Sequence, residues 1–226
     1  DWLPILVKMN AADGLPWGGL KLDEAVAAAQ IFARAGADAV VPSFGYTSLN
    51  GFGMLRGDVP LEQMAEAMPY RATRWLVRWL GRVLVPAIPF QSMFLRDAAV
   101  RFVEALRGSA AVCIYVGGCD SLGAVQEAMA MGCAAVQIGR PLIREPWFVR
   151  KLEAAHRALQ HEPYGAPTAA KSAPASASAS ASSESTCVRC NLCTLASIDP
   201  VRFPSGCPYL QPGEGQAFEP ADIEDL

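Results

Sequence analysis

The stretch Tyr115–Ile143, YVGGCDSLGAVQEAMAMGCAAVQIGRPLI, holds two short apolar runs that each end in glycine. The first run ends at Gly117 and Gly118, and the second ends at Gly139, next to Arg140. Glycine lets backbone N–H groups approach an anion closely, and arginine offers a planar fork of donors for phosphate oxygens. Because phosphate sites in (β/α) barrels commonly form after the last two strands, this stretch predicts a phosphate site.

Two familiar phosphate motifs do not explain the stretch. Gly118 and Gly123 have the spacing of a P-loop, but Ala124 and Val125 stand where lysine and serine or threonine belong. The dinucleotide pattern G-x-G-x-x-G is also missing from the stretch. Ordinary glycine turns after two strands remain the alternative to a phosphate site.

The sequence on both sides of this stretch alternates between strand-like and helix-like segments. An (β/α)8 TIM barrel needs eight strands, whereas the pattern predicts four, each followed by helical material. We therefore expect the C-terminal half of a TIM barrel, which lacks its first half, and a complete four-stranded α/β sheet is the alternative. The predicted strands are Leu3–Lys8, Ala37–Ser43, Ala111–Gly117 and Ala134–Gly139, and the predicted helices are Leu20–Gly36, Leu61–Leu80, Ala98–Leu106, Leu122–Met131 and Trp147–Leu159.

The composition divides the chain into three parts. Residues 1–162 carry the barrel pattern. Residues 163–186 are rich in serine, alanine and proline and have almost no apolar surface to bury, so a disordered linker is expected. Residues 187–226 form a cysteine-rich tail module.

Charge and hydropathy narrow the range of partners. The net charge is -3, so neither nucleic acid nor a membrane surface is expected as a partner. The expected partner is a small-molecule substrate. The most membrane-like segment, residues 74–90, contains three arginines and two prolines, which predicts that it does not cross a bilayer. The chain has seven cysteines, and the tight Cys-x-x-Cys spacing near its C-terminus favours metal or redox chemistry in a reducing, cytoplasmic compartment.

The stretch from Val116 to Leu152 resembles the end of the barrel in the Old Yellow Enzyme family of NADH:flavin oxidoreductases. The resemblance implies that Gly117, Gly118, Gly139 and Arg140 hold the phosphate of FMN. The first strand, in PILVKMNAADG, is similar to the family strand whose basic residue faces the flavin ring, and that residue would be Lys8. A cation at this place would stabilise the anionic reduced flavin. The chain departs from the family pattern at Ala135, where an aspartate is usual.

The cysteine tail carries a second resemblance. Its sequence CVRCNLC, with a later cysteine, is similar to the module that binds a [4Fe–4S] cluster in 2,4-dienoyl-CoA reductase-like members. The spacing here differs slightly from the family spacing, and four thiolates could also bind zinc or no metal. The candidate ligands are Cys187, Cys190, Cys193 and Cys207.

These resemblances imply an FMN-dependent NAD(P)H oxidoreductase of the ene-reductase type. Hydride would pass from NAD(P)H to FMN and then to an activated alkene or a related acceptor. The substrate-anchoring and proton-donating residues of the family lie in the first barrel half, so the catalytic residues here are unknown. The alternatives are a non-redox phosphate-binding lyase or isomerase with a zinc tail, and an inactive piece of a barrel.

Overall fold

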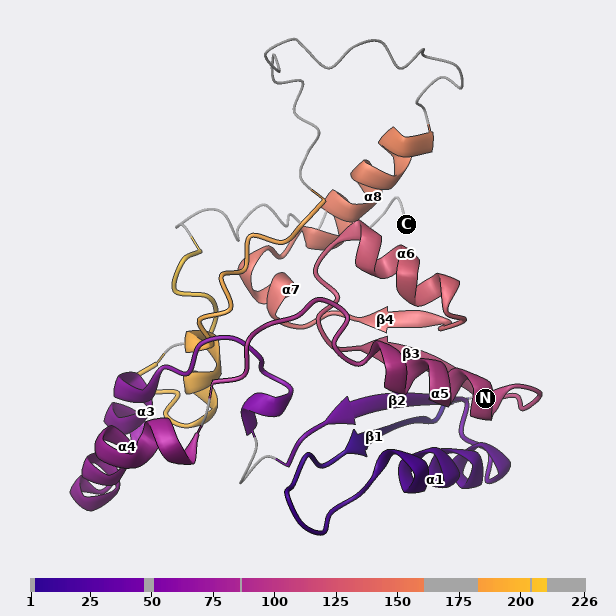
Figure 1. The fold of residues 1–226 in the computed structure, drawn as a ribbon. Helices are drawn as coiled ribbons and strands as arrows, with labels where there is room; N and C mark the ends of the chain where they lie inside the picture. Colours follow the sequence, from indigo (N-terminus) through magenta and orange to yellow (C-terminus); the bar gives the residue numbers. More distant parts are fainter. Residues whose placement is uncertain (1–2, 47–50, 86, 161–182, 204, 211–226) are drawn as a thin grey trace, which may run out of the picture.

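The computed structural model describes residues 3–46, 51–85, 87–160, 183–203 and 205–210 (Figure 1). Each predicted strand is present, with its bounds shifted by a few residues. The strands are β1 (Leu6–Ala12), β2 (Ala39–Phe44), β3 (Val112–Val116) and β4 (Ala135–Gln137). The helices are α1 (Leu22–Arg34), α3 (Leu61–Ala67), α4 (Arg71–Leu84), α5 (Arg96–Leu106), α6 (Leu122–Ala130), α7 (Arg140–Arg144) and α8 (Phe148–Gln160), with short 3-10 helices η1 (Gly51–Gly53) and η2 (Leu192–Ser197).

The four strands form one parallel sheet in the order β1-β2-β3-β4. Helices α1, α5 and α6 alternate with the strands and lie along the sheet (Figure 1). A parallel pair needs a crossover between its strands, and these helices supply it. The structure is thus a mixed α/β arrangement that agrees with part of a (β/α) barrel.

The two faces of the sheet differ in exposure at β1 and β3, whereas Ala39–Phe44 of β2 is largely buried on both faces. Val40 and Cys113 pair in register and are 0% and 2% exposed, because α1 and α5 cover their face. Leu6 and Val112 both pair with Ala39, so they share the opposite face, and they are 56% and 41% exposed. Parallel sheets normally have both faces covered. The described residues therefore leave one face of this sheet partly open.

The predicted helix from Leu61 to Leu80 is wrong in one respect, because the structure has two helices there. Met68 ends α3 with extended backbone dihedrals, φ −70° and ψ 135°. It precedes Pro69, and a residue before proline is pushed out of the helical region by the proline ring. A new helix, α4, starts at Arg71. In the part of the chain that the structure describes, neither α4 nor any other helix is both long and apolar enough to cross a bilayer.

The tail returns to the core before its first cysteine. Ser183 and Ser185 make backbone hydrogen bonds to Leu122 and Asp120, beside the start of α6. The contacts of the tail thus begin four residues before Cys187, where the sequence predicts the start of the tail module. Most of the predicted linker, residues 163–182, lies outside the described residues.

Candidate functional site

A cavity of about 310 Å³ lies at the carboxyl ends of the strands. It brings together all five residues predicted to contact the cofactor: Lys8, Gly117, Gly118, Gly139 and Arg140. The carboxyl ends of parallel strands meet at one edge of a sheet, which explains why the glycines after β3 and β4 share this cavity, whereas Lys8 lies in the first half of β1. Its volume is at the lower end of the range of about 300–1,000 Å³ for ligand pockets.

The three glycines of the cavity differ in whether the fold itself requires a glycine at that position. Gly117 and Gly118 have φ of 122° and 75°, values that side chains with a Cβ rarely adopt. A Cβ on Gly118 would also lie 2.7 Å from the carbonyl oxygen of Gln91. By contrast, a Cβ on Gly139 would meet no atom within 4 Å. The fold alone therefore explains why Gly117 and Gly118 are glycines. Gly139, in contrast, leaves open space on the cavity wall.

Lys8 reaches the cavity from β1. It lies on the open face of the sheet, since it pairs in register with Val41, two residues after Ala39. Its Nζ donates a 3.3 Å hydrogen bond to Oε1 of Gln137, at the end of β4. Both side chains line the cavity and are exposed. Lys8 thus places a positive charge inside the space that a ligand would occupy.

Arg140 is more strongly held by the protein than the sequence suggests. Its Nη1 donates to the carbonyl oxygens of Leu55 and Arg56, at 3.2 and 2.8 Å, and to Oδ1 of Asn191 at 2.7 Å. Burial lowers the pKa of its guanidinium, the largest effect on that group. One edge of Arg140 therefore fastens the loop after η1 to the tail, while the residue still lines the cavity.

Asn191 is the residue that sequence reasoning missed. It is 1% exposed, and its Nδ2 donates to the carbonyl oxygens of Leu55 and Asp58, at 2.5 and 2.8 Å. Its φ of 59° lies in the left-handed region, which asparagine tolerates better than most residues. The sequence signal that could have identified this residue is its position between closely spaced cysteines. Through these bonds Asn191 fixes the tail against the cavity.

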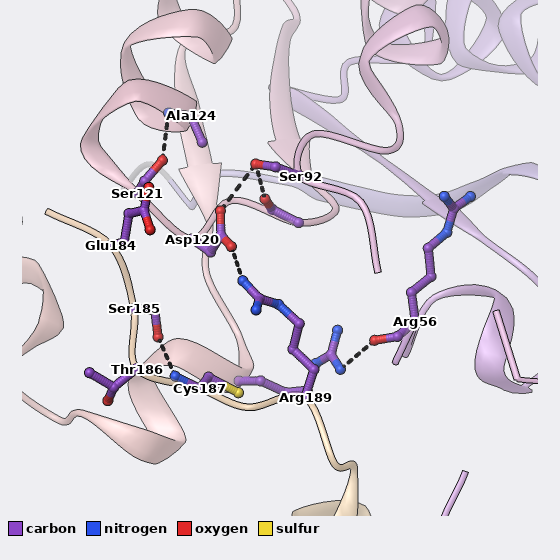
Figure 2. A network of polar contacts seen from close by, with 12 residues as sticks. Arg56, Ser92, Asp120, Ser121, Ala124, Glu184, Ser185, Thr186, Cys187 and Arg189 are labelled. Atoms are coloured by element: carbon purple, nitrogen blue, oxygen red, sulfur yellow. Dashed lines mark hydrogen bonds and ion pairs between the residues drawn. The ribbon is translucent and has the colours of Figure 1, made fainter. Parts of the chain in front are cut away.

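Arg189 and Asp120 form a second link between the tail and the α/β part of the chain (Figure 2). Asp120 also accepts a 3.1 Å hydrogen bond from the hydroxyl of Ser92, and the guanidinium of Arg189 lies 3.7 Å from the centre of the Phe90 ring. Arg189, Asp120 and Phe90 all line the cavity. The tail is therefore part of the cavity wall, joined to the loop that follows β3.

Glu145 anchors the start of the tail at the junction of α7 and α8. The residue is 4% exposed, and it accepts hydrogen bonds from the Thr186 N–H at 2.7 Å and from the Ser185 hydroxyl at 3.1 Å. Lys151 pairs with it at 2.9 Å. Burial acts to raise the pKa of Glu145, but these three partners outweigh it, and its pKa lies below the usual value. The carboxylate is thus ionised in its role as anchor.

The four tail cysteines line one small space of about 20 Å³, beside Arg140. In the residues that the structure describes, no three or more His, Cys, Asp or Glu side chains are arranged to hold a single metal ion. The irons of a cluster are separate atoms, so its four ligand sulfurs do not have to converge on one point. Four thiolates chemically suit either an iron–sulfur cluster or zinc, and the described geometry does not decide between them.

The cysteines of the α/β part, Cys113, Cys119 and Cys133, are buried, as expected for structural residues. Cys119 also lines the cavity, but burial and the neighbouring Asp120 raise the pKa of its thiol to about 12. At neutral pH this thiol is protonated, and the thiolate is the nucleophilic form. Cys119 is therefore unsuited to attack a substrate.

No family model matches the chain. The chain is similar to the 4,4'-dithiodibutanoate disulfide reductase of Rhodococcus erythropolis, with 32% identity over 151 residues. The match covers 66% of this chain and 36% of the relative, so the chain spans about a third of the relative's length. A disulfide reductase is an oxidoreductase, and the comparison therefore agrees with the predicted redox class rather than with a lyase or isomerase.

Proposed function

We propose that this chain is the flavin-binding C-terminal part of an NAD(P)H-dependent oxidoreductase with a (β/α) barrel. The observation that carries the proposal is the shared cavity of Lys8, Gly118, Gly139 and Arg140 at the carboxyl ends of the strands. FMN, when bound, would supply hydride transfer from NAD(P)H to the acceptor.

The glycine loops are suited to bind the phosphate of the cofactor. Gly117 and Gly118 turn the chain directly after β3, and Gly139 leaves space at the end of β4. Backbone N–H groups in such turns bind anions well. Arg140 would add positive charge beside them, with one edge of its guanidinium occupied by protein oxygens.

Lys8 is suited to the ring end of the cofactor. Among the described residues its one side-chain partner is the neutral amide of Gln137, and no acidic group in that part of the chain pairs with it. A positive charge within the cavity favours any ligand that gains negative charge during the reaction. Lys8 would therefore stabilise the reduced, anionic form of the flavin ring.

The open face of the sheet supports the proposal that a further half completes the barrel. Leu6 and Val112 expose apolar side chains on a face that parallel sheets normally cover. Four more strands would cover this face and remove both sheet edges. In this proposal the first half also supplies the residues that anchor the substrate.

Two acceptor classes have a specific observation in their favour. The family resemblance favours an activated alkene, reduced as NAD(P)H + H⁺ + C=C → NAD(P)⁺ + CH–CH. The name of the R. erythropolis relative favours an organic disulfide, reduced as NAD(P)H + H⁺ + RSSR → NAD(P)⁺ + 2 RSH. The protonated state of Cys119 argues against thiol–disulfide exchange through that cysteine.

The first test is binding of FMN to the full chain, expressed with whatever coding sequence flanks it in the gene. Binding is followed by the quenching of flavin fluorescence. The Gly139→Ala variant adds a methyl group where the protein has open space, so we expect weaker FMN binding in a variant that circular dichroism shows to be folded.

The matched control is Gly123→Ala, on α6 and outside the cavity, where a Cβ meets only the Ser121 hydroxyl, at 3.9 Å. It should bind FMN like the unaltered protein. A well-folded protein that does not bind FMN, or a Gly139→Ala variant with unchanged affinity, would contradict the proposal. Binding of inorganic phosphate without FMN would favour the non-redox alternative.

We also propose a [4Fe–4S] cluster on the four tail cysteines, which would carry electrons to or from the flavin site. Two of them, Cys187 and Cys193, line the flavin cavity as well as the small space of the cluster. Anaerobic purification should give iron and sulfide in equal amounts, and Cys190→Ser should abolish both. Cys133→Ala, in the core, is the control. Stoichiometric zinc in place of iron would contradict the cluster.

A further inference from the structure

Helix α4 carries a large apolar face that no described part of the chain covers. Trp75, Trp79 and Val83 follow one another at four-residue spacing, so they lie on one side of the helix, and they are 61%, 72% and 79% exposed. Leu76 and Leu80, also exposed, widen this side. These five residues are here named the tryptophan face. The two indole rings lie 6.0 Å apart, centre to centre.

The opposite side of α4 fixes the direction of the tryptophan face. Gly81 is buried against α3, where a Cβ would lie 2.9 Å from Cδ2 of Leu61. Arg74 donates a 2.7 Å hydrogen bond to the carbonyl oxygen of Met68 at the end of α3. Helix α4 is thus held by α3, and its tryptophan face points away from that contact. Figure 1 shows the two helices together, apart from the edge strands β1 and β4.

A strip of arginines borders the tryptophan face. Arg71, Arg78 and Arg82 are exposed and lie on adjoining turns of α4, which contains no acidic residue. Among the described residues these three form no ion pair. The net charge of the whole chain is -3, so this strip is a local positive patch on an acidic protein. Its charge is complementary to an anionic surface.

We propose that α4 lies in the interface of an anionic membrane, with the tryptophan face in the lipid and the arginines at the headgroups. Helices that bind in this way combine a basic polar side with an apolar side rich in tryptophan and leucine. Tryptophan is enriched at the level of the headgroups, and each arginine near an anionic leaflet adds to the affinity. The helix lies on the bilayer and does not span it.

A second copy of the chain fits the same face less well. The commonest self-association is a two-fold contact, in which each surface meets the same surface of its partner. That contact would bring the arginine strips of two chains together, where their positive charges repel. Helix α4 contains no carboxylate that could pair with these arginines. An anionic lipid surface has the opposite sign, and it is flat enough to meet the whole length of the helix.

The test is flotation of the full chain with vesicles, one set of phosphatidylcholine and one of equal parts phosphatidylcholine and phosphatidylglycerol. We expect the chain to float with the anionic vesicles alone, and its tryptophan emission to shift to shorter wavelength. Added salt should release it, because salt screens the arginine strip. All substitutions are at exposed positions, and circular dichroism checks that each variant is folded.

Arg78→Gln/Arg82→Gln should lower vesicle binding at least about tenfold. Trp75→Gln/Trp79→Gln should remove both the binding and the emission shift. The matched control Trp17→Gln/Arg34→Gln removes an exposed tryptophan and an exposed arginine elsewhere and should change nothing. Failure to float, or equal binding to neutral vesicles, would overturn the proposal. So would a dimer in solution that Trp75→Gln/Trp79→Gln dissociates, which would assign the face to a second copy.

Discussion

Lys8 and Gln137 join the first and the fourth strand of the sheet by a hydrogen bond of 3.3 Å. In a flat sheet these strands would lie about 14 Å apart, three spacings of about 4.8 Å. Side chains stand roughly perpendicular to a sheet, so their tips meet across two intervening strands only where the surface is concave. The contact thus marks the curvature that a (β/α) barrel requires, and it lies on the open face.

The charge of Lys8 should matter for the ligand and not for the fold. We expect Lys8→Met to weaken FMN binding by about 1 kcal/mol, or about fivefold in Kd, because the site loses a partly solvated cation. The melting temperature should stay the same, since Lys8 is exposed and makes one hydrogen bond. Fluorescence titration measures the first quantity. Arg107→Gln, an exposed position far from the cavity, controls for net charge; a loss equal to that of Lys8→Met would contradict a local role.

Gly118 should matter for the fold. Replacing it with alanine forces a left-handed φ of 75° on a residue with a Cβ and sets that Cβ 2.7 Å from the Gln91 oxygen. We expect a loss of about 2–4 kcal/mol in the free energy of unfolding, measured in urea. Gly123→Ala, inside α6, should instead gain about 0.5–1 kcal/mol. If Gly118→Ala is as stable as the unaltered chain, the loop after β3 has a different conformation.

Asn191 should be the strongest single attachment of the tail. Asn191→Ala removes the acceptor of Arg140 and the donor to Leu55 and Asp58, and it places alanine at a left-handed φ. We expect a loss of about 2–4 kcal/mol. Trypsin should then cut faster after Arg189, which gives a direct measure of tail release.

Asn191→Gly separates the two causes of that loss, because glycine adopts the left-handed conformation freely. It should restore about 1 kcal/mol relative to Asn191→Ala and still fall below the unaltered protein. Full stability of Asn191→Gly would mean that the buried hydrogen bonds contribute nothing, contrary to the geometry of the site.

Acid should release the tail through Glu145. Its pKa in the folded chain is below the usual value, so ionised Glu145 stabilises the fold. This contribution is complete above the pKa of Glu145 in the unfolded chain, near the usual 4.3, and it disappears as the pH falls through the folded value. At pH 7 we expect Glu145→Gln to be about 1–3 kcal/mol less stable, since it lacks the charge-assisted bonds.

Urea unfolding from neutral pH down to strongly acidic pH would check this expectation. The stability curves of Glu145→Gln and the unaltered chain should converge at low pH, where both side chains are neutral. Glu153→Gln, whose partner Arg157 is on the surface, should follow the unaltered chain at every pH. Parallel curves for Glu145→Gln would show that the carboxylate is not ionised in its anchoring role.

Sequence periodicity was sufficient for the sheet and for the place of the cavity. The apolar runs that end at Gly117 and Gly139 are strands, and strands separated by helices pair in parallel, with their carboxyl ends together. That rule brings the two glycine loops together, whereas Lys8, the third residue of β1, reaches the cavity from the open face of the sheet. The break at Pro69 was also readable, since proline disfavours a helical residue before it.

The partners of Arg140 could not be read from the sequence. Its bond to Arg56 joins residues 84 positions apart, and its bond to Asn191 joins residues 51 positions apart, across a segment without periodic pattern. Hydrophobic periodicity reports which face of an element is buried and says nothing about which polar groups meet between elements. The contacts of Glu145 with Ser185 and Thr186 were hidden for the same reason.

The wall of the cavity that contains Arg189 and Cys193 comes from the far end of the chain. A ribosome makes all four strands before it makes this wall, so the sheet can pair while one side of the cavity is missing. A product that stops within residues 161–182 would keep Lys8 and every glycine of the site. It would lack the part of the cavity wall that the tail supplies, and it should therefore hold the ligand less well. Tight ligand binding would then show that translation had continued past Asn191.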